Sequence, residues 1–498
     1  MASVNGHSAV MWTSVVHLVR ACCESISLLS RRVILRAVCT SEPRCSDEGT
    51  RLRGVNISEA SARVLPGVLD DLKRLVAIPS ISSLPEHHDD VVAASEEVAR
   101  LIREAGAAEV RFLEAGGKPA VYAHFPAPEG QPTVLLYSHY DVQPTGDVAQ
   151  WSSSPFEATE RDGRLFGRGA ADDKGGVAVH LAALRVFDGK PPVGVKLLIE
   201  GEEEQGSPTM SALLDKYPEE TSADVFVIAD ATNWEVGSPS LTTMLRGLVD
   251  ATVTVKTLET PMHSGAYGGV VPDALTALCR LMATLHDERG NVAIEGLVSS
   301  DDVAVDYSDE RLREETGLLD GVELIGDGPA AARLWTKPTA SVLAIDATPV
   351  KDVSNVLVPS ARAVVSVRIA PTDDPERASE ALKKHLLEHA PWGAQVEVEA
   401  GRGGSGSFLE LTDDRAQAAV AAFKEAFGKE PVEMGCGGSI PIVADFSSRN
   451  PDALVLVTAV VDPYSRMHGI DESLGLDDFG KACHAEAQLL ANLAEIQA

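Results

Sequence analysis

Three short apolar runs separated by helix-forming segments constrain the fold of this chain more than any other feature. Residues 133–137, 195–199 and 225–228 are almost continuously apolar, as strands in the interior of a sheet are. The segments between them, residues 176–187 and 208–215, have apolar residues at helical spacing. Strands that alternate with helices predict an α/β domain, with a mixed sheet covered by helices on both faces.

Further segments extend this pattern toward both ends of the chain. Apolar periodicity predicts helices over residues 58–76, 91–105, 414–427 and 477–495, and strands over residues 109–114, 120–125 and 453–457. We expect all of them to belong to the same α/β domain.

The pattern changes near Arg246. The strand-like and helical segments that follow are residues 248–255, 273–287, 340–345, 363–369, 375–389 and 395–399. Strands followed by a helix, twice, predict a two-layer α+β unit inserted into the first domain. The expected parts are an extension at residues 1–57, a first domain at 58–245 and 401–498, and the inserted unit at 246–400.

The first 57 residues differ from the rest of the chain. They contain seven arginines and no lysine, among many Ser, Val and Cys residues. A transit peptide has this composition, yet the apolar run at residues 9–21 is interrupted by His17 and Arg20 and lacks a convincing cleavage site. We therefore expect an unstructured extension, or a start codon assigned too far upstream.

Composition excludes several classes of function. The net charge of -31 argues against nucleic acid as a partner, because phosphate binding requires clustered Lys and Arg. The seven cysteines form no C-x-x-C pair, so we expect neither a disulfide framework nor a thiolate zinc site, and a reducing, cytoplasmic compartment fits best. No apolar run approaches 18 residues without charge, which predicts no membrane span.

Residues of the kind that bind metals follow the predicted strands. His139 comes just after the first central strand, and Asp141 lies two residues further on the same face of an extended segment. Asp141 can therefore reach the imidazole and fix its tautomer, as carboxylates do for metal-binding histidines. Taken alone, the pair would more often be an ordinary surface pair.

The other candidates are equally ambiguous one by one. Asp172 and Asp173 could stabilise a helix N-terminus, or Asp172 could bridge two metal ions. The run 202–204 consists of three glutamates, which could form a solvated loop, or one could bind metal while a neighbour accepts a proton from water. Asp230 and His468 each follow a predicted strand and are unremarkable alone.

The joint placement of these residues changes the interpretation. All lie at or just beyond strand ends of one predicted sheet, where the binding residues of α/β proteins gather. Two histidines and three carboxylates suit a divalent ion such as zinc, and a shared carboxylate would let five ligands hold two ions.

Four ordered motifs resemble those of the M20 metallopeptidases, and within that family the branch of the cytosolic nonspecific dipeptidases and carnosinases. The motifs are Ser138-His139-Tyr140-Asp141-Val142-Gln143-Pro144, Gly167-Arg168-Gly169-Ala170-Ala171-Asp172-Asp173-Lys174-Gly175, Glu203-Glu204-Gln205-Gly206-Ser207 and His263-Ser264-Gly265-Ala266-Tyr267-Gly268-Gly269. The resemblance extends from about residue 58 to the end. It implies a di-zinc hydrolase, with manganese or cobalt as alternative metals, whose catalytic domain carries an inserted lid and dimerisation domain.

The resemblance also implies a role for each residue of the centre. Asp172 would bridge the two ions and be followed by a cis peptide bond. His139 and Asp230 would complete one ion's site, and Glu204 and His468 the other. Glu203 would be the general base, and Asp141 would act in catalysis through His139. Gly206-Ser207 sets this register, in which Glu202 is left over, although a one-residue slip stays open.

Three further residues are implied by the resemblance alone. His263 would come from the partner subunit of a homodimer and stabilise the oxyanion of the tetrahedral intermediate. Arg368 and Ser439 would hold the terminal carboxylate of the substrate. The chain departs from the family pattern around His468, where Met467-His468-Gly469-Ile470-Asp471-Glu472 replaces the usual Ala-His-Ser before a later Asn-Glu.

The expected activity is hydrolysis of the amide bond of dipeptides or short peptides by a metal-activated water. An N-acyl amino acid or succinyl-diaminopimelate deacylase is the alternative, because these enzymes share the motifs. A noncatalytic binding protein built on the same fold is a more remote one, since no ligand or base is missing.

Overall fold

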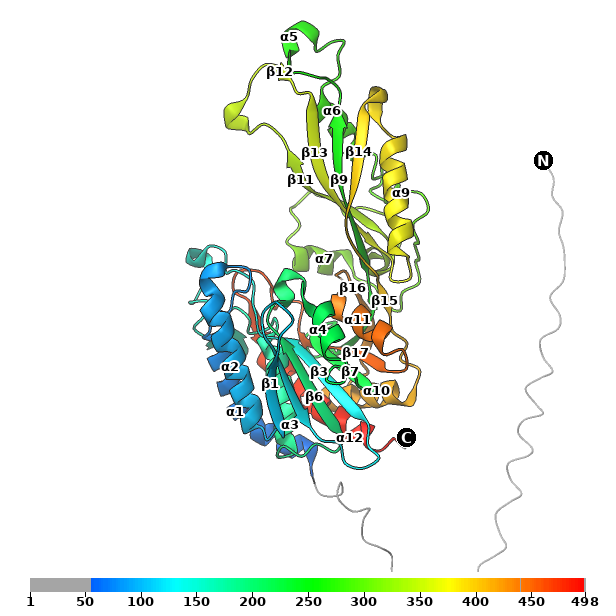
Figure 1. Cartoon of the computed structure of the whole chain (residues 1–498). Helices are drawn as coiled ribbons and strands as arrows, with labels where there is room; N and C mark the ends of the chain where they lie inside the picture. The colour runs from blue at the N-terminus through cyan, green and yellow to red at the C-terminus, as the bar shows by residue number, and fades with distance from the viewer. Residues whose placement is uncertain (1–54, 439, 497–498) are drawn as a thin grey trace, which may run out of the picture. The chain divides into compact units, whose positions relative to one another are not determined.

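The computed structural model describes residues 55–438 and 440–496, and two separate sheets organise this part of the chain (Figure 1). The predicted extension at residues 1–57 lies outside the described residues, apart from its last three. Helix α1 (Ile57–Val76) begins where the Asn56 side chain accepts a hydrogen bond from the amide of Glu59. None of the helices in the described ranges combines the length and hydrophobicity that crossing a membrane requires.

The larger sheet has nine strands and is mixed. Its four parallel central strands are, in spatial order, β6 (Gly194–Glu200), β3 (Thr133–His139), β7 (Val225–Thr232) and β17 (Leu454–Val461). Outside β6 lie the antiparallel strands β2 (Ala120–Phe125) and β1 (Glu109–Leu113). Beyond β17 lie β8 (Ser240–Leu245), β15 (Ser407–Phe408) and β16 (Val432–Cys436). The predicted α/β class with a mixed sheet is confirmed.

Side chains alternate along the central strands and fill a core on each face of the sheet. On one face, Leu136 and Val227 belong to a cluster that includes residues of α2 (His88–Glu104), α3 (Lys174–Val186), α10 (Asp414–Phe427) and α12 (Leu476–Leu493). On the other face, Leu135 and Phe226 pack with α4 (Met210–Lys216) and α11 (Pro441–Arg449). Phe446 of α11 stacks on Phe226 with ring centroids 4.3 Å apart. Helices thus cover both faces.

The smaller sheet has four antiparallel strands, in the order β11 (Thr339–Asp346), β13 (Ser360–Ile369), β9 (Gly247–Lys256) and β14 (Gln395–Gly404). Helices α6 (Ala274–Ala283) and α9 (Pro375–Glu388) pack on it through a core of their own. The chain enters this sheet after Arg246, between β8 and β9, and leaves it between β14 and β15. The result is a two-layer α+β unit with its own hydrophobic core.

A long segment of the inserted unit packs back onto the larger sheet. It contains α7 (Asp309–Thr316) and α8 (Ala330–Trp335), and Trp335 lies in a cluster with Met244 of β8 and Met434 of β16. A Cβ atom at Gly435 would lie 2.3 Å from Cγ of Trp335, so only glycine fits there.

Two small groups of strands complete the described structure. Strands β4 (Thr159–Arg161), β5 (Arg164–Phe166) and β18 (Ser473–Gly475) form a three-stranded sheet. Strands β10 (Met262–His263) and β12 (Val356–Leu357) pair beside the short helix α5 (Ser264–Tyr267).

Candidate metal centre

The carboxyl ends of the parallel strands and the loops beyond them bring the predicted ligands together. His139 is the last residue of β3, and Asp230 lies in β7. The loop after β6 forms the 3-10 turn Glu203–Gln205, and His468 lies beyond β17. Asp172 lies just before α3. Segments more than 300 residues apart in sequence thus meet at one edge of the sheet, as the topology of a parallel sheet predicts.

The side chains form two groups, each able to hold a metal ion. The ligand atoms of His139, Asp173 and Asp230 lie within 4.8 Å of one another, as do those of Asp172, Glu204 and His468. All five predicted ligands are therefore in the two groups. Asp173 is the additional member that the sequence did not indicate.

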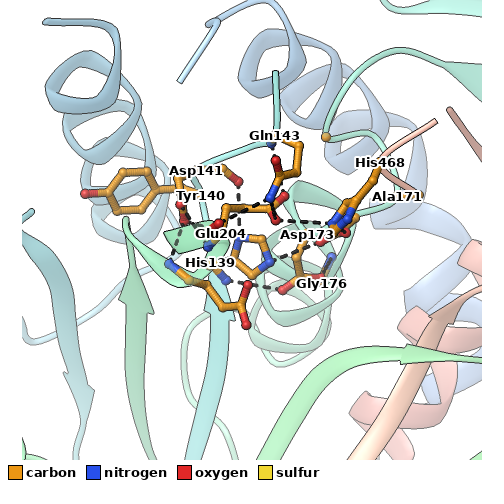
Figure 2. A network of polar contacts seen from close by, with 12 residues as sticks. His139, Tyr140, Asp141, Gln143, Ala171, Asp173, Gly176, Glu204 and His468 are labelled. Atoms are coloured by element: carbon orange, nitrogen blue, oxygen red, sulfur yellow. Dashed lines mark hydrogen bonds and ion pairs between the residues drawn. The ribbon is translucent and has the colours of Figure 1, made fainter. Parts of the chain in front are cut away.

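Asp172 lies between the two groups, with one carboxylate oxygen toward each histidine. Its Oδ1 is 3.1 Å from Nε2 of His139, and its Oδ2 is 3.0 Å from Nε2 of His468. Nε2 of His468 is also 3.2 Å from Oε2 of Glu204. The peptide bond between Asp172 and Asp173 is cis, as the family resemblance implies. Figure 2 shows the side chains of His139, Glu204 and His468 pointing toward one another.

Asp141 orients two parts of the centre. Nδ1 of His139 lies 3.1 Å from the carbonyl oxygen of Asp141 and 3.4 Å from its Oδ1. Because Nδ1 is occupied in this way, Nε2 of His139 faces the ligands. The Asp141 carboxylate also accepts hydrogen bonds from the amides of Glu203 and Glu204, each at 3.2 Å.

The three consecutive glutamates point in different directions. The Glu202 carboxylate accepts hydrogen bonds from the amides of Lys118 and Thr209, both at 2.9 Å, and so lies away from the centre. Glu204 accepts hydrogen bonds from the Gln143 amide at 3.1 Å and from its side chain at 2.9 Å. Glu203 stands between them in sequence, and no residue within 55–438 or 440–496 forms a hydrogen bond with its carboxylate.

The electrostatics of the centre are those of carboxylates crowded out of water. Burial raises the pKa of Asp173 to about 8 and that of Glu203 to about 7, and neighbouring carboxylates add to the rise. Burial would also raise the pKa of Asp172, but hydrogen bonds from both histidines outweigh it and lower that pKa. Hydrogen bonds to Asp172 and Glu204 raise the pKa of His468 to about 10. The site attracts positive charge strongly.

A buried ion pair between helices α3 and α12 contacts strand β3, which ends in His139. Nδ1 of His180 in α3 is 2.8 Å from Oε1 of Glu486 in α12, and its Nε2 is 3.0 Å from the carbonyl oxygen of Tyr137 in β3. Burial alone would lower the pKa of His180, but these partners outweigh it and raise that pKa. With an acceptor at each nitrogen, the imidazolium form is favoured.

Three predicted residues lie apart from this cluster or outside the description. His263 is exposed beside α5, which lies at the end of the inserted sheet remote from β3 and β6 (Figure 1). Arg368 lies in β13, in register with Thr339 of β11. Ser439 lies outside the described residues.

A second arginine near Arg368 gave no signal in the sequence. Arg246 is 7% exposed, and its Nε donates to the carbonyl oxygen of Gly437 at 3.1 Å. Within residues 55–438 and 440–496, no carboxylate lies in ion-pairing distance of Arg246. Burial, together with the like charge of Arg368, lowers the pKa of Arg246 to about 10. In the sequence, Arg246 is marked only by its place at the start of the predicted insertion.

Comparison with known proteins identifies the class to which this fold and site belong. Residues 135–492 match the sequence profile of the peptidase family M20/M25/M40, and the chain belongs to this family. The predicted resemblance and the predicted metallopeptidase class are thereby confirmed.

Individual relatives are dipeptidases by name. The chain is 36% identical over 434 residues to the cysteinylglycine-S-conjugate dipeptidase of Corynebacterium striatum, a match covering 85% of this chain and 94% of that protein. It is 28% identical over 459 residues to the Cys-Gly metallodipeptidase dug1 of Schizosaccharomyces pombe, covering 85% and 95%.

Solved structures share the fold. The dipeptidase Dug1p of Saccharomyces cerevisiae matches with a TM-score of 0.75 at 22% identity, over 89% of this chain and 98% of its own. The M20 family metallo-carboxypeptidase Sso-CP2 of Sulfolobus solfataricus matches with a TM-score of 0.73 at 26% identity, over 86% and 99%.

The His180–Glu486 pair predicts a pH-dependent contribution to stability. Because the folded-state pKa of His180 is raised, the contribution is complete below the unfolded value of about 6.5 and is lost as pH rises through the folded pKa. We expect Glu486→Gln to lower the free energy of unfolding by about 3 kcal/mol at about pH 6 and by clearly less at about pH 9. Urea unfolding followed by circular dichroism measures both values.

Asp71→Asn is the matched control for this experiment. Asp71 is a buried carboxylate paired with Arg185 at 2.6 Å, and an arginine does not titrate in this range. Its effect should be equal at both pH values. A Glu486→Gln effect that is equally independent of pH would contradict the protonated pair.

Proposed function

We propose that this protein is a dipeptidase that uses two divalent cations, with zinc as the expected metal. The proposed ligands are His139, Asp172, Glu204, Asp230 and His468. The observation that carries the proposal is the position of Asp172, whose two oxygens each face a histidine of a different ligand group. A carboxylate in that position is suited to bridging two ions.

The donor set fits the proposed metals. Imidazole nitrogens and carboxylate oxygens are ligands that zinc accepts, and manganese and cobalt are alternatives with the same donors. Asp173 and Asp230 both have raised pKa values, mainly because of burial and then because of neighbouring carboxylates. Cations would remove the repulsion that these groups otherwise relieve by binding protons.

Glu203 is the proposed general base. When bound, the two cations would acidify a water molecule and polarise the scissile carbonyl. The backbone N–H of Glu203 donates a hydrogen bond to the Asp141 carboxylate, which fixes the Glu203 backbone, and burial raises the pKa of the Glu203 carboxyl to about 7. A carboxyl with that pKa can accept the proton of the attacking water near neutral pH and return it to the leaving amine.

Arg368 and Ser439 are proposed to bind the terminal carboxylate of the substrate, and the surroundings of Arg246 support an anion site here. Two guanidinium groups close together repel each other, and an anion between them would offset this repulsion. A guanidinium also matches a carboxylate through paired hydrogen bonds. Dipeptides carry such a carboxylate one residue beyond the scissile carbonyl, as the last peptide bond of a longer peptide also does, so this contact favours cleavage at the carboxyl end of a peptide.

We assign His263 to the active site of the partner subunit in a homodimer. Its own chain holds it at the remote end of the inserted sheet. Exposed apolar side chains lie on the segments around it: Val270, which is 91% exposed, follows α5, and Val350 and Val353, 92% and 79% exposed, precede β12, whose Val356 pairs with His263. Apolar side chains so exposed mark interaction surfaces, and a second copy would cover them while delivering the imidazole.

The cytoplasm is the proposed compartment. Cys279, Cys436 and Cys483, which are the cysteines within the described ranges, form no disulfide. Free cysteines of this kind are expected where thiols are kept reduced.

The first test is metal-dependent activity on a mixed dipeptide library. We expect two equivalents of metal per chain, hydrolysis that is abolished by a chelator, and recovery when zinc, manganese or cobalt is added back. Elemental analysis and chromatographic product detection measure these quantities. Preferential hydrolysis of N-acyl amino acids or succinyl-diaminopimelate over dipeptides would instead support the deacylase alternative.

Glu203→Gln tests the general base. The variant should keep its metal, because Glu203 is not a proposed ligand, and should lose turnover by about 10²–10⁴-fold. Glu202→Gln is the matched control, since its carboxylate lies away from the centre; the variant loses one acceptor oxygen for the amides of Lys118 and Thr209, and its turnover should fall far less than that of Glu203→Gln. Wild-type turnover of Glu203→Gln, or a larger loss in Glu202→Gln, would contradict the assigned register.

Mixing two inactive variants tests the contribution of the partner subunit. In a heterodimer of Glu203→Gln and His263→Ala, one of the two active sites combines an intact Glu203 with an intact His263. Exchange of subunits should therefore restore about a quarter of wild-type activity in an equimolar mixture. If exchange is verified by differently tagged subunits and no activity returns, His263 does not act across the interface.

A further inference from the structure

A second buried ion pair lies beside the metal centre and has no role in the proposed chemistry. Arg168 is 1% exposed and Glu472 is 0% exposed. Nη1 of Arg168 donates to Oε2 of Glu472 at 2.5 Å. Burying both charges is costly unless their remaining polar atoms also find partners, and among the described residues all of them do except Nε of Arg168. Those partners indicate what the pair does.

The Glu472 carboxylate binds the loop that carries Asp172. Its Oε2 accepts a hydrogen bond from the amide of Gly169 at 3.0 Å. Its Oε1 accepts from the amides of Ala171 at 3.0 Å and Asp172 at 3.1 Å. The backbone of the proposed bridging residue is therefore fixed by a carboxylate 300 residues away in sequence.

The Arg168 guanidinium binds the loop after β3 and the loop that carries His468. Nη2 donates to the carbonyl oxygen of Pro144 and to that of Gly469, both at 3.2 Å. Pro144 follows Gln143, which holds the Glu204 carboxylate. Gly469 directly follows His468. One side chain thus connects the loops that determine where Asp172, Glu204 and His468 lie.

The loop around His468 needs such external support. His468 itself has φ of 61°, and Arg466 and Asp471 have φ of 53° and 57°. Non-glycine residues in this left-handed region carry a conformational cost that surrounding contacts must offset. The His468 side chain is 56% exposed, so packing contributes little to holding it.

We propose that Arg168 and Glu472 are positioning residues of the metal centre, which hold the Asp172 loop and the His468 loop at the spacing that two cations require. They contact neither metal nor substrate and act through the ligands. This inference rests on the proposed function, because it presupposes that the centre binds metal.

Zinc affinity of Glu472→Gln in the full chain tests the inference. The amide keeps the size of the side chain but removes its charge and one acceptor oxygen, so Arg168 or the loop amides lose a partner. We expect zinc to bind about 10–100-fold more weakly at one site or both, as for other residues that orient metal ligands. Competition with a chromophoric chelator measures the dissociation constants, and the visible spectrum of the cobalt-loaded protein reports changed coordination.

Two further variants separate positioning from general stability. Asp71→Asn removes an ion pair between α1 and α3 in which the carboxylate is buried and the Arg185 side chain is 21% exposed, and it should lower the unfolding midpoint of the metal-free protein without changing zinc affinity. Arg168→Lys keeps a cation near Glu472 but cannot donate to two carbonyls and the carboxylate in the same geometry. It should also bind zinc more weakly, and it provides the test if Glu472→Gln does not fold.

The outcomes are distinct for the two proposals. Unchanged zinc affinity in a folded Glu472→Gln or Arg168→Lys variant would overturn the positioning role, as would an equal loss in Asp71→Asn. A wild-type protein that binds no zinc, manganese or cobalt would overturn the metal centre on which the inference rests.

Discussion

Negative charge buried at one edge of the sheet is the constraint on which the rest of this structure depends. Asp141, Asp173, Glu202 and Glu472 are all nearly inaccessible to water, and each accepts at least two hydrogen bonds from backbone amides. Amide donors compensate a carboxylate without adding a charge that would compete with a metal. The loops at this edge therefore take conformations in which their amides solvate carboxylates. The negative charge of the centre is then left to attract cations.

The proposed ligands differ in whether they lie in strands or in loops. His139 and Asp230 lie in central strands: His139 pairs with Glu200 of β6, and the residues that flank Asp230, Ile228 and Ala231, pair with β17. Asp172, Glu204 and His468 lie on loops or in a single 3-10 turn, where the backbone has no such ladder. These loop residues receive additional hydrogen bonds from Gln143, Asp141 or the pair of Arg168 and Glu472. The extra hydrogen bonds compensate for the absence of sheet pairing.

Much of the fold could be predicted because apolar periodicity reports directly on burial. The central strands and the long helices have strong patterns and occur where expected. Strands β4, β5 and β18 have only three residues each, too few for any period to be read, and β8 contains two threonines that weaken its apolar signal. Elements of this kind form because tertiary partners are present, and the sequence of the element alone does not encode those partners.

The proposed ligands could be predicted from their motifs, and Asp141 could be predicted as the partner of His139, but Glu472 and Arg246 could not. Glu472 acts through amides of Gly169, Ala171 and Asp172, and any residue but proline offers the same amide, so no side-chain pattern marks the contact. Arg246 gains its significance only from burial and from the nearness of Arg368, both consequences of how two sheets meet.

The meeting of the two sheets has a consequence for where a peptide is cleaved under the proposed function. Arg368 lies on the inserted sheet, Arg246 marks the point where the chain enters it, and the ligands lie on the other sheet. Arg246 donates to the carbonyl oxygen of Gly437, which follows β16 of the larger sheet, and to the side chain of Thr339 in β11 of the inserted sheet at 3.2 Å. It therefore connects the proposed anion site to both sheets. A terminal carboxylate held at that site would leave a fixed span to the reacting carbonyl at the metal centre. Because that span is set by folded elements at both ends, it would fix how far the scissile carbonyl lies from the terminal carboxylate, which is the selectivity that distinguishes an enzyme acting at the end of a peptide from a general peptidase.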